Sequence, residues 1–82
     1  MLPYREALDC LRRGDWQAAH EIVQALDDPL AYRMHAAVHR LEGDLSNAKY
    51  WYRKARLNID LAEPIEQELG RIDTLIQELA QL

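Results

Sequence analysis

The sequence has 82 residues, a net charge of −4 and a single cysteine, Cys10. A chain of this length has room for one domain, buries roughly 60% of its unfolded surface and, with one cysteine, forms no internal disulfide. Glycine and proline are scarce and charged residues interrupt every apolar segment, which favours an all-α protein and excludes a membrane span of about 20 apolar residues.

Proline, glycine and aspartate mark the helix boundaries of the first half of the chain. Pro3 suits the first turn of a helix over residues 3–13, and Gly14 permits the left-handed backbone that ends a helix. Asp15 can then cap a second helix over residues 16–27. The first 28 residues are therefore predicted to form a helical hairpin.

The same boundary signals return in the middle of the chain. Asp28 and Pro29 begin a third helix, and Gly43 and Asp44 form a second corner between helices. The helices predicted on either side of that corner cover residues 29–42 and 45–57. Residues 29–57 are thus predicted to form a second hairpin.

Residues 58–82 carry one further predicted helix, which Pro64 opens and which runs to about residue 81. Its apolar residues alternate at spacings of four and three, and they are Ile65, Leu69, Ile72, Ile76 and Leu79. Such a heptad-like stripe covers other helices or pairs with its counterpart in a second molecule. We therefore expect a long C-terminal helix that either caps the hairpins or forms a homodimer.

An internal repeat links the two hairpins. Four residues recur at an offset of 29, with Ala7, Gly14, Asp15 and Ala19 returning as Ala36, Gly43, Asp44 and Ala48. The segments Gly14-Asp15-Trp16-x-x-Ala19 and Gly43-Asp44-Leu45-x-x-Ala48 resemble the tetratricopeptide repeat family over residues 3–56. The resemblance implies hairpins stacked as a short solenoid that acts in protein–protein interaction. The offset is shorter than the usual repeat of about 34 residues, which implies a shortened link between units.

The resemblance also places a partner-binding surface on the first helix of each unit. Its residues are Tyr4, Leu8 and Leu11 in the first unit and Arg33, Ala37 and Arg40 in the second. Arg33 and Arg40 lie two helical turns apart, so both can face one way and bind carboxylates. We therefore expect a protein or peptide partner with acidic groups.

An alternative for these arginines is solvation or pairing with Glu66, Glu68 or Asp73 of the last helix. The charge distribution supports such pairing: residues 1–30, 31–56 and 57–82 carry balances of −3, +4 and −5. A basic middle segment between acidic ends can be neutralised within one chain or between two copies.

Three consecutive aromatic residues, Tyr50, Trp51 and Tyr52, spread over roughly 200° of one helix and cannot all face one core. The resemblance gives Tyr52 an inward position. Trp51 and Tyr50 then pack under the last helix, which is the favoured interpretation, or Trp51 forms part of a binding surface.

His35 and His39 lie four residues apart and can chelate zinc, with His20 as a conceivable third ligand. The segment lacks the glutamate of the metalloprotease motif, and no cysteine pair completes a site. Packing of the imidazoles at a helix crossing is therefore favoured, and we expect no metal or other cofactor.

Neither catalysis nor nucleic-acid binding is favoured. The basic residues Lys49, Arg53, Lys54 and Arg56 could contact phosphates beside the aromatic residues, but the negative net charge argues against this. Cys10 is a lone thiol, and no phosphate-binding loop or activated nucleophile is recognisable. The opening residues lack the apolar core of a signal peptide, so we expect a cytoplasmic interaction module, with homodimerisation as the alternative role.

Overall fold

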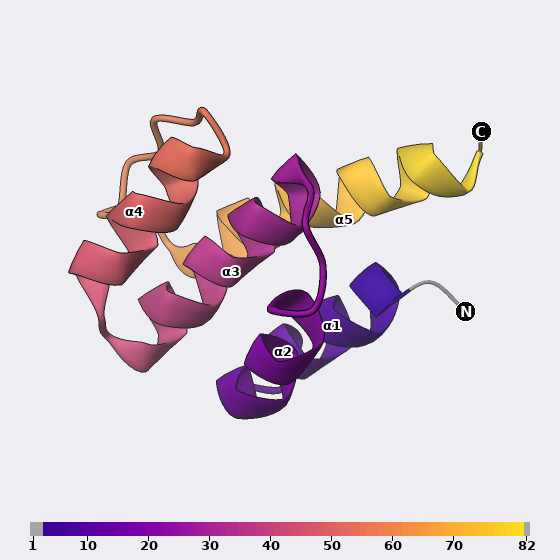
Figure 1. The fold of residues 1–82 in the computed structure, drawn as a ribbon, viewed down its shortest axis with the longest axis horizontal. Coiled ribbons are helices and arrows are strands. Elements are labelled where there is room, and N and C mark those ends of the chain that lie inside the picture. The colour runs from indigo at the N-terminus through magenta and orange to yellow at the C-terminus, as the bar shows by residue number, and fades with distance from the viewer. Residues whose placement is uncertain (1–2, 82) are drawn as a thin grey trace.

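The computed structural model describes residues 3–81, which form five α-helices and, within that range, no β-strand. The helices are α1 (Pro3–Arg12), α2 (Trp16–Val23), α3 (Pro29–Glu42), α4 (Leu45–Lys54) and α5 (Ile65–Ala80). This arrangement confirms the all-α prediction, and the molecule measures 32 × 23 × 23 Å (Figure 1). None of the helices described is long and apolar enough to cross a membrane.

Both predicted Gly-Asp corners are present. Gly14 and Gly43 adopt left-handed backbone, with φ values of 77° and 90°, directly after α1 and α3. The carboxylates of Asp15 and Asp44 accept hydrogen bonds from the backbone N–H three residues further on, and so cap α2 and α4. Three residues separate α1 from α2 and two residues separate α3 from α4, so each corner ends one helix and starts the next.

Two helices end earlier than the sequence pattern predicted. α2 stops at Val23 rather than at residue 27, because the chain turns to place Asp28 in extended backbone, where its carboxylate caps α3. α4 stops at Lys54 rather than at residue 57, because Arg56 adopts left-handed backbone with a φ of 63°. Arginine rarely takes this conformation, so the sequence held no signal for the second stop.

Small residues at the repeated positions let neighbouring helices approach closely. Ala7, Ala19, Ala36 and Ala48 are all completely buried. α1 packs on α2, α2 on α3 and α3 on α4, so consecutive helices contact each other along the chain. The small methyl side chain of alanine lets two helix axes lie close together where they cross, so alanine suits all four repeated positions.

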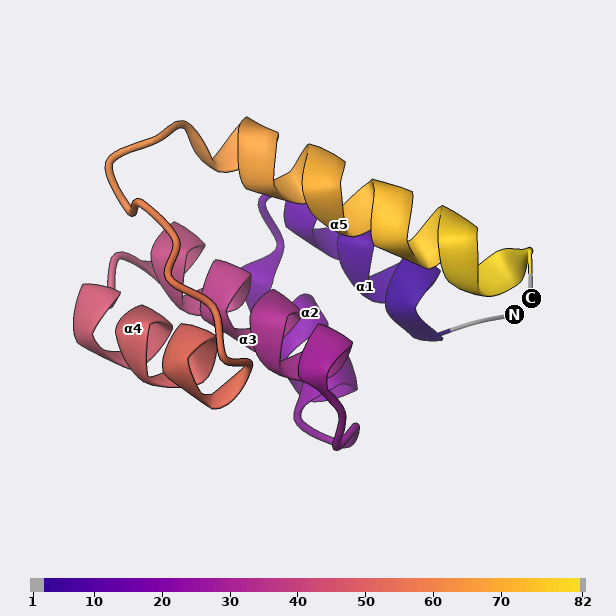
Figure 2. The same ribbon diagram turned by 90° about the horizontal axis from the view of Figure 1, so that it is seen from above.

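The last helix, α5, lies along α1 and α3 (Figures 1 and 2). Leu69, Ile72 and Ile76 of its apolar stripe are buried in one core with Leu8 of α1. Leu79, at the C-terminal end of the stripe, is 43% exposed. The structure therefore uses most of the stripe inside the chain and leaves its last turn uncovered.

Candidate functional site

The surface predicted to receive a partner is covered by α5. Leu8, Leu11 and Ala37 of the first helices are buried and share the core with Leu69 and Ile72 of α5. Leu11 is 2% exposed and lines a small hollow beside Ile65 and Leu69 of α5. The structure therefore places this candidate partner-binding residue inside the core.

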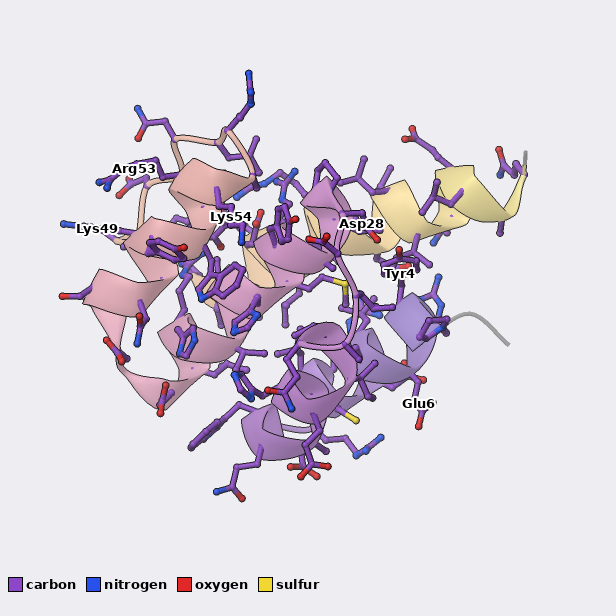
Figure 3. All side chains as sticks on the ribbon, in the orientation of Figure 1. Tyr4, Glu6, Asp28, Lys49, Arg53 and Lys54 are labelled. Atoms are coloured by element: carbon purple, nitrogen blue, oxygen red, sulfur yellow. The ribbon has the colours of Figure 1, made fainter. Side chains whose placement is uncertain are left out.

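Tyr4 occupies a different environment, at the edge of α1. Its hydroxyl donates a hydrogen bond to the carboxylate of Asp28, and Figure 3 shows the two side chains turned toward each other. This hydrogen bond, with burial and the negative charge of Asp28, raises the pKa of Tyr4 to about 12. Tyr4 thus links α1 to the start of α3.

Arg33 is bound to α5. Its Nε donates to Oε2 of Glu68 and its Nη2 to Oε1, both at 2.8 Å, and Arg71 donates to Oε1 at 3.0 Å. Burial by itself raises the pKa of Glu68, but hydrogen bonds from Arg33, Arg71 and Tyr52 and the charge of Arg33 outweigh it and lower the pKa below its usual range. Pairing of Arg33 with the last helix, the alternative expectation, is confirmed.

Arg40 is engaged as well. Its Nη2 donates to the backbone carbonyl of Glu63 at 2.7 Å and its Nη1 to the Tyr52 hydroxyl at 3.3 Å. Burial is the main cause that raises the pKa of Tyr52 to about 12; the nearby Glu68 adds to the rise and Arg40 opposes it. Arg40 therefore ties α3 to the segment that leads into α5.

Basic residues of α1 also contact the acidic last helix. Arg5 and Arg12 pair with the two carboxylate oxygens of Asp73 at 2.8 and 3.0 Å. Together with the pair between Arg33 and Glu68, these contacts neutralise acidic groups of α5 within one chain. The internal pairing that the charge distribution favoured is present for Arg33 of the basic middle segment, whereas Arg5 and Arg12 belong to the acidic first segment.

An open apolar groove of about 530 Å³ lies between the start of α3, the segment after α4 and the last turns of α5. The groove is lined by Pro29, Leu30, Arg33, Ala55, Leu57, Leu75, Glu78 and Leu79. Three separate segments build its walls, so sequence reasoning did not find it. The exposed end of the α5 stripe was the one signal that pointed to it.

Basic side chains gather on α4 and just after it. Lys54 and Arg56 flank the groove residue Ala55, whereas Lys49 and Arg53 line a neighbouring hollow with Tyr52 and Leu57. This basic surface of α4 consists of Lys49, Arg53, Lys54 and Arg56, which are all exposed. Figure 3 shows Lys49 and Arg53 projecting away from the other helices. Within residues 3–81 none of the four forms an ion pair, whereas four other arginines do. Lys54 lies over the rings of Tyr32 and Trp51, 4.8 Å from each centroid, so its charge contacts aromatic faces instead of a carboxylate.

The aromatic residues of α4 are divided between core and surface. Tyr52 is buried, as the family resemblance implied, and Tyr50 is 53% exposed. Trp51 stacks on His35, with ring centroids 3.8 Å apart and planes 11° apart, and Tyr32 lies 5.8 Å away. The prediction that Trp51 packs under the last helix is therefore wrong. α5 lies along α1 and α3, which leaves Trp51 to pack on α3 alone.

The structure brings together all three histidines. The ring of His20, from α2, lies 4.7 Å from that of His35 and 5.7 Å from that of His39, both on α3. One nitrogen of each ring is within 4.8 Å of the others, so the cluster can hold a metal ion. Burial, followed by the charges of His20, His39 and Lys54, lowers the pKa of His35 to about 4.

No family model matches the chain, and no curated protein or solved structure matches it either. The features that can carry a function are therefore those of the described residues themselves. They are the apolar groove, the basic surface of α4 and the histidine cluster.

Proposed function

We propose that this protein is a small interaction module, built of tetratricopeptide-like hairpins, that binds an amphipathic acidic helix of a partner protein. In this proposal α1 with α2 and α3 with α4 form the two hairpins, and α5 fills the surface of their first helices. The partner then binds in the apolar groove beyond α5. The observation that carries the proposal is an open apolar groove beside a basic surface without ion pairs.

The apolar character of the groove favours a helix with a hydrophobic face. Leu30, Leu57 and Leu75 line the walls as half-buried side chains, and Leu79 is 43% exposed at the rim. Each leucine still has apolar area to bury, at about 25 cal/mol for each Å² removed from water. An amphipathic helix offers side chains at three- and four-residue spacings that suit such a groove.

The charges around the groove favour acidic groups on the partner. Arg56 follows the groove residue Ala55 directly, and Arg53 and Lys54 precede it. Acidic side chains of a bound helix would face these cations. Glu78, on the α5 wall, would repel acidic side chains of the partner. We therefore expect the acidic edge of the partner to face α4 and its uncharged edge to face α5.

A peptide-binding experiment tests the proposal. Fluorescent helical peptides are titrated with the protein, and anisotropy gives the Kd of each. The peptides share one face of leucines, and their polar faces are acidic, neutral or basic. We expect the acidic peptide to bind most tightly and the basic peptide least. Salt should weaken binding of the acidic peptide, because exposed charges are screened. The reverse order of affinity would contradict the proposal.

Matched variants then locate the binding surface. Leu79→Asp places a charge in the groove and should weaken binding of the acidic peptide by about tenfold or more. Leu45→Asp changes a leucine that is 50% exposed on α4 outside the groove, and it should leave the Kd unchanged. Equal losses in the two variants would show that the peptide binds elsewhere.

A further pair of substitutions separates charge from apolar contact. Lys54→Glu with Arg56→Glu reverses the two exposed charges on either side of the groove residue Ala55. We expect this double variant to lose the preference for acidic over basic peptides. Single-stranded DNA serves as a competitor: if it binds the wild type more tightly than the acidic peptide does, the partner is a nucleic acid and the proposal fails.

A further inference from the structure

Three imidazoles from two helices meet at one point that the proposed peptide groove does not include. His35 and His39 lie one turn apart on α3, and His20 comes from the last turn of α2. One nitrogen atom of each ring lies within 4.8 Å of one nitrogen atom of the other two. We propose that His20, His35 and His39 together bind one Zn²⁺ ion, with water as the fourth ligand.

The convergence follows from how the repeat packs. Ala19 precedes His20 and Ala36 follows His35, and both alanines are completely buried where α2 packs on α3. The close approach of the two helices brings the rings of His20 and His35 to a centroid distance of 4.7 Å. Spacing by one helical turn places His39 on the same side, 5.1 Å from His35.

The distances allow a tetrahedral site after a small closure. With Zn–N bonds of about 2.0–2.1 Å, ligand nitrogens in a tetrahedron lie about 3.4 Å apart. The present limit of 4.8 Å exceeds this by about 1.4 Å, and rotation of the half-buried His20 ring about its side-chain bonds can supply much of this movement.

Neighbouring groups hold two of the rings in place. Nδ1 of His39 is hydrogen-bonded to Oε1 of Glu42 at 2.8 Å, which leaves Nε2 for a ligand. A carboxylate on the second ring nitrogen is the partner that zinc-bound histidines commonly have. The indole of Trp51 stacks on His35 and fixes the plane of that ring. His20, which is half-buried, is then free to adjust to the ion.

The histidine cluster has unused ring nitrogens, and one cation and one carboxylate lie beside it. In the described part of the chain, the bond to Glu42 is the one side-chain hydrogen bond of the three rings, so nitrogen lone pairs remain available. Lys54 of α4, whose Nζ lies 4.8 Å from the Trp51 ring centroid, opposes the ion, and Glu42 of α3 favours it.

The donor atoms decide the class of metal. Three neutral imidazole nitrogens suit Zn²⁺ and its neighbours among the transition metals, whereas Mg²⁺ and Ca²⁺ require oxygen ligands. His39, Glu42 and Asp44 also lie within 4.8 Å of one another. Asp44 however caps α4 by accepting the N–H of Asn47, and Glu42 is bound to His39. The three histidines are therefore the set that is free to coordinate.

Metal titration of the untagged, chelator-treated protein tests the site. Zn²⁺ is titrated by calorimetry and Co²⁺ by visible absorption, both at about pH 7 because metal affinity depends on pH. We expect one ion for each chain, the absorption bands of tetrahedral Co²⁺ and their loss when Zn²⁺ is added. The midpoint of thermal unfolding should rise with Zn²⁺, because the ion binds the folded chain.

Variants distinguish the histidine cluster from other ligands. His20→Ala and His39→Ala should each lower Zn²⁺ affinity by at least about tenfold, while Asp44→Asn, which keeps a capping side chain, should leave it unchanged. His20→Gln is a second, more conservative variant. Its circular dichroism spectrum should match that of the wild type, which shows that any loss of Zn²⁺ affinity does not come from unfolding. The proposal is overturned by absence of stoichiometric Zn²⁺ binding, by unchanged affinity in a folded His20 variant, or by loss of binding in Asp44→Asn.

Discussion

Arg33 and Glu68 form a two-bond ion pair that joins α3 to α5 inside the protein. Both hydrogen bonds are 2.8 Å long, and the side chains of Arg33 and Glu68 are 13% and 0% exposed. The pair lies beside the apolar contacts of Ile72 and Ile76, so charge and core act together to hold α5 over the first helices. A partner that binds the first helices must therefore bind beside α5 or displace it.

Glu68→Gln is expected to destabilise the protein strongly. Glutamine leaves the largely buried Arg33 guanidinium without its counter-charge, and removal of one partner of a buried pair costs about 3–5 kcal/mol. Urea unfolding followed by circular dichroism measures the loss. Glu66→Gln, at an exposed position on the same helix, is the matched control and should change the free energy of unfolding by less than about 0.5 kcal/mol.

A double variant shows whether the loss comes from unpaired charge. Arg33→Met combined with Glu68→Met replaces the pair by apolar side chains, which is often neutral or stabilising. We expect the double variant to be more stable than Glu68→Gln. If Glu68→Gln is as stable as the wild type, the ion pair does not hold α5 in place.

The same pair predicts how stability depends on pH. The pKa of Glu68 is lower in the folded protein than its unfolded value of about 4.3, so the folded state favours the ionised carboxylate. The resulting stabilisation is complete above about pH 4.3 and is lost as the pH falls through the folded pKa. The difference in unfolding free energy between wild type and Glu68→Gln should therefore shrink below about pH 4. A constant difference down to about pH 2 would contradict this linkage.

The corners and the core were predictable because local signals specify them. Gly14 and Gly43 supply left-handed backbone, and the aspartates after them supply caps, wherever the rest of the chain lies. The left-handed Arg56 gave no such signal, since an arginine takes this conformation only when surrounding contacts impose it. The early end of α4 therefore needed the structure.

The functional features depended more on tertiary packing. His20 could be suggested beside His35 and His39, but only the packing of α2 on α3 shows that the three rings meet. Whether Arg33 faces a partner or α5 could not be decided from spacing, because both arrangements need the same helix face. The groove was not predictable from any single segment, since α3, α5 and the chain after α4 each supply a wall.

Ile72 provides a test of the self-association alternative. Its side chain is completely buried within one chain, so Ile72→Val should lower the free energy of unfolding by about 0.5–1.5 kcal/mol. Light scattering should give the mass of one chain for wild type and variant, and the urea midpoint should not change with protein concentration. A midpoint that rises with concentration, or a dimer that Ile72→Val weakens, would show that the stripe pairs between chains.

Gly70 and Gly43 are expected to respond to alanine with opposite signs. Gly70 lies within α5, and an added Cβ there meets no atom within 4 Å. Gly70→Ala should therefore raise the free energy of unfolding by about 0.5–1 kcal/mol, because alanine loses less conformational freedom in a helix. Gly43 has the same open space but a φ of 90°.

Gly43→Ala should accordingly lower the free energy of unfolding by about 1 kcal/mol, since an L-residue is strained in left-handed backbone. Urea unfolding of both variants measures the two effects. Neither added methyl group makes a new contact. Opposite changes in the free energy of unfolding would therefore show that the two sites differ only in backbone conformation. Loss of stability in Gly70→Ala would instead show that α5 is not a regular helix at that position in solution.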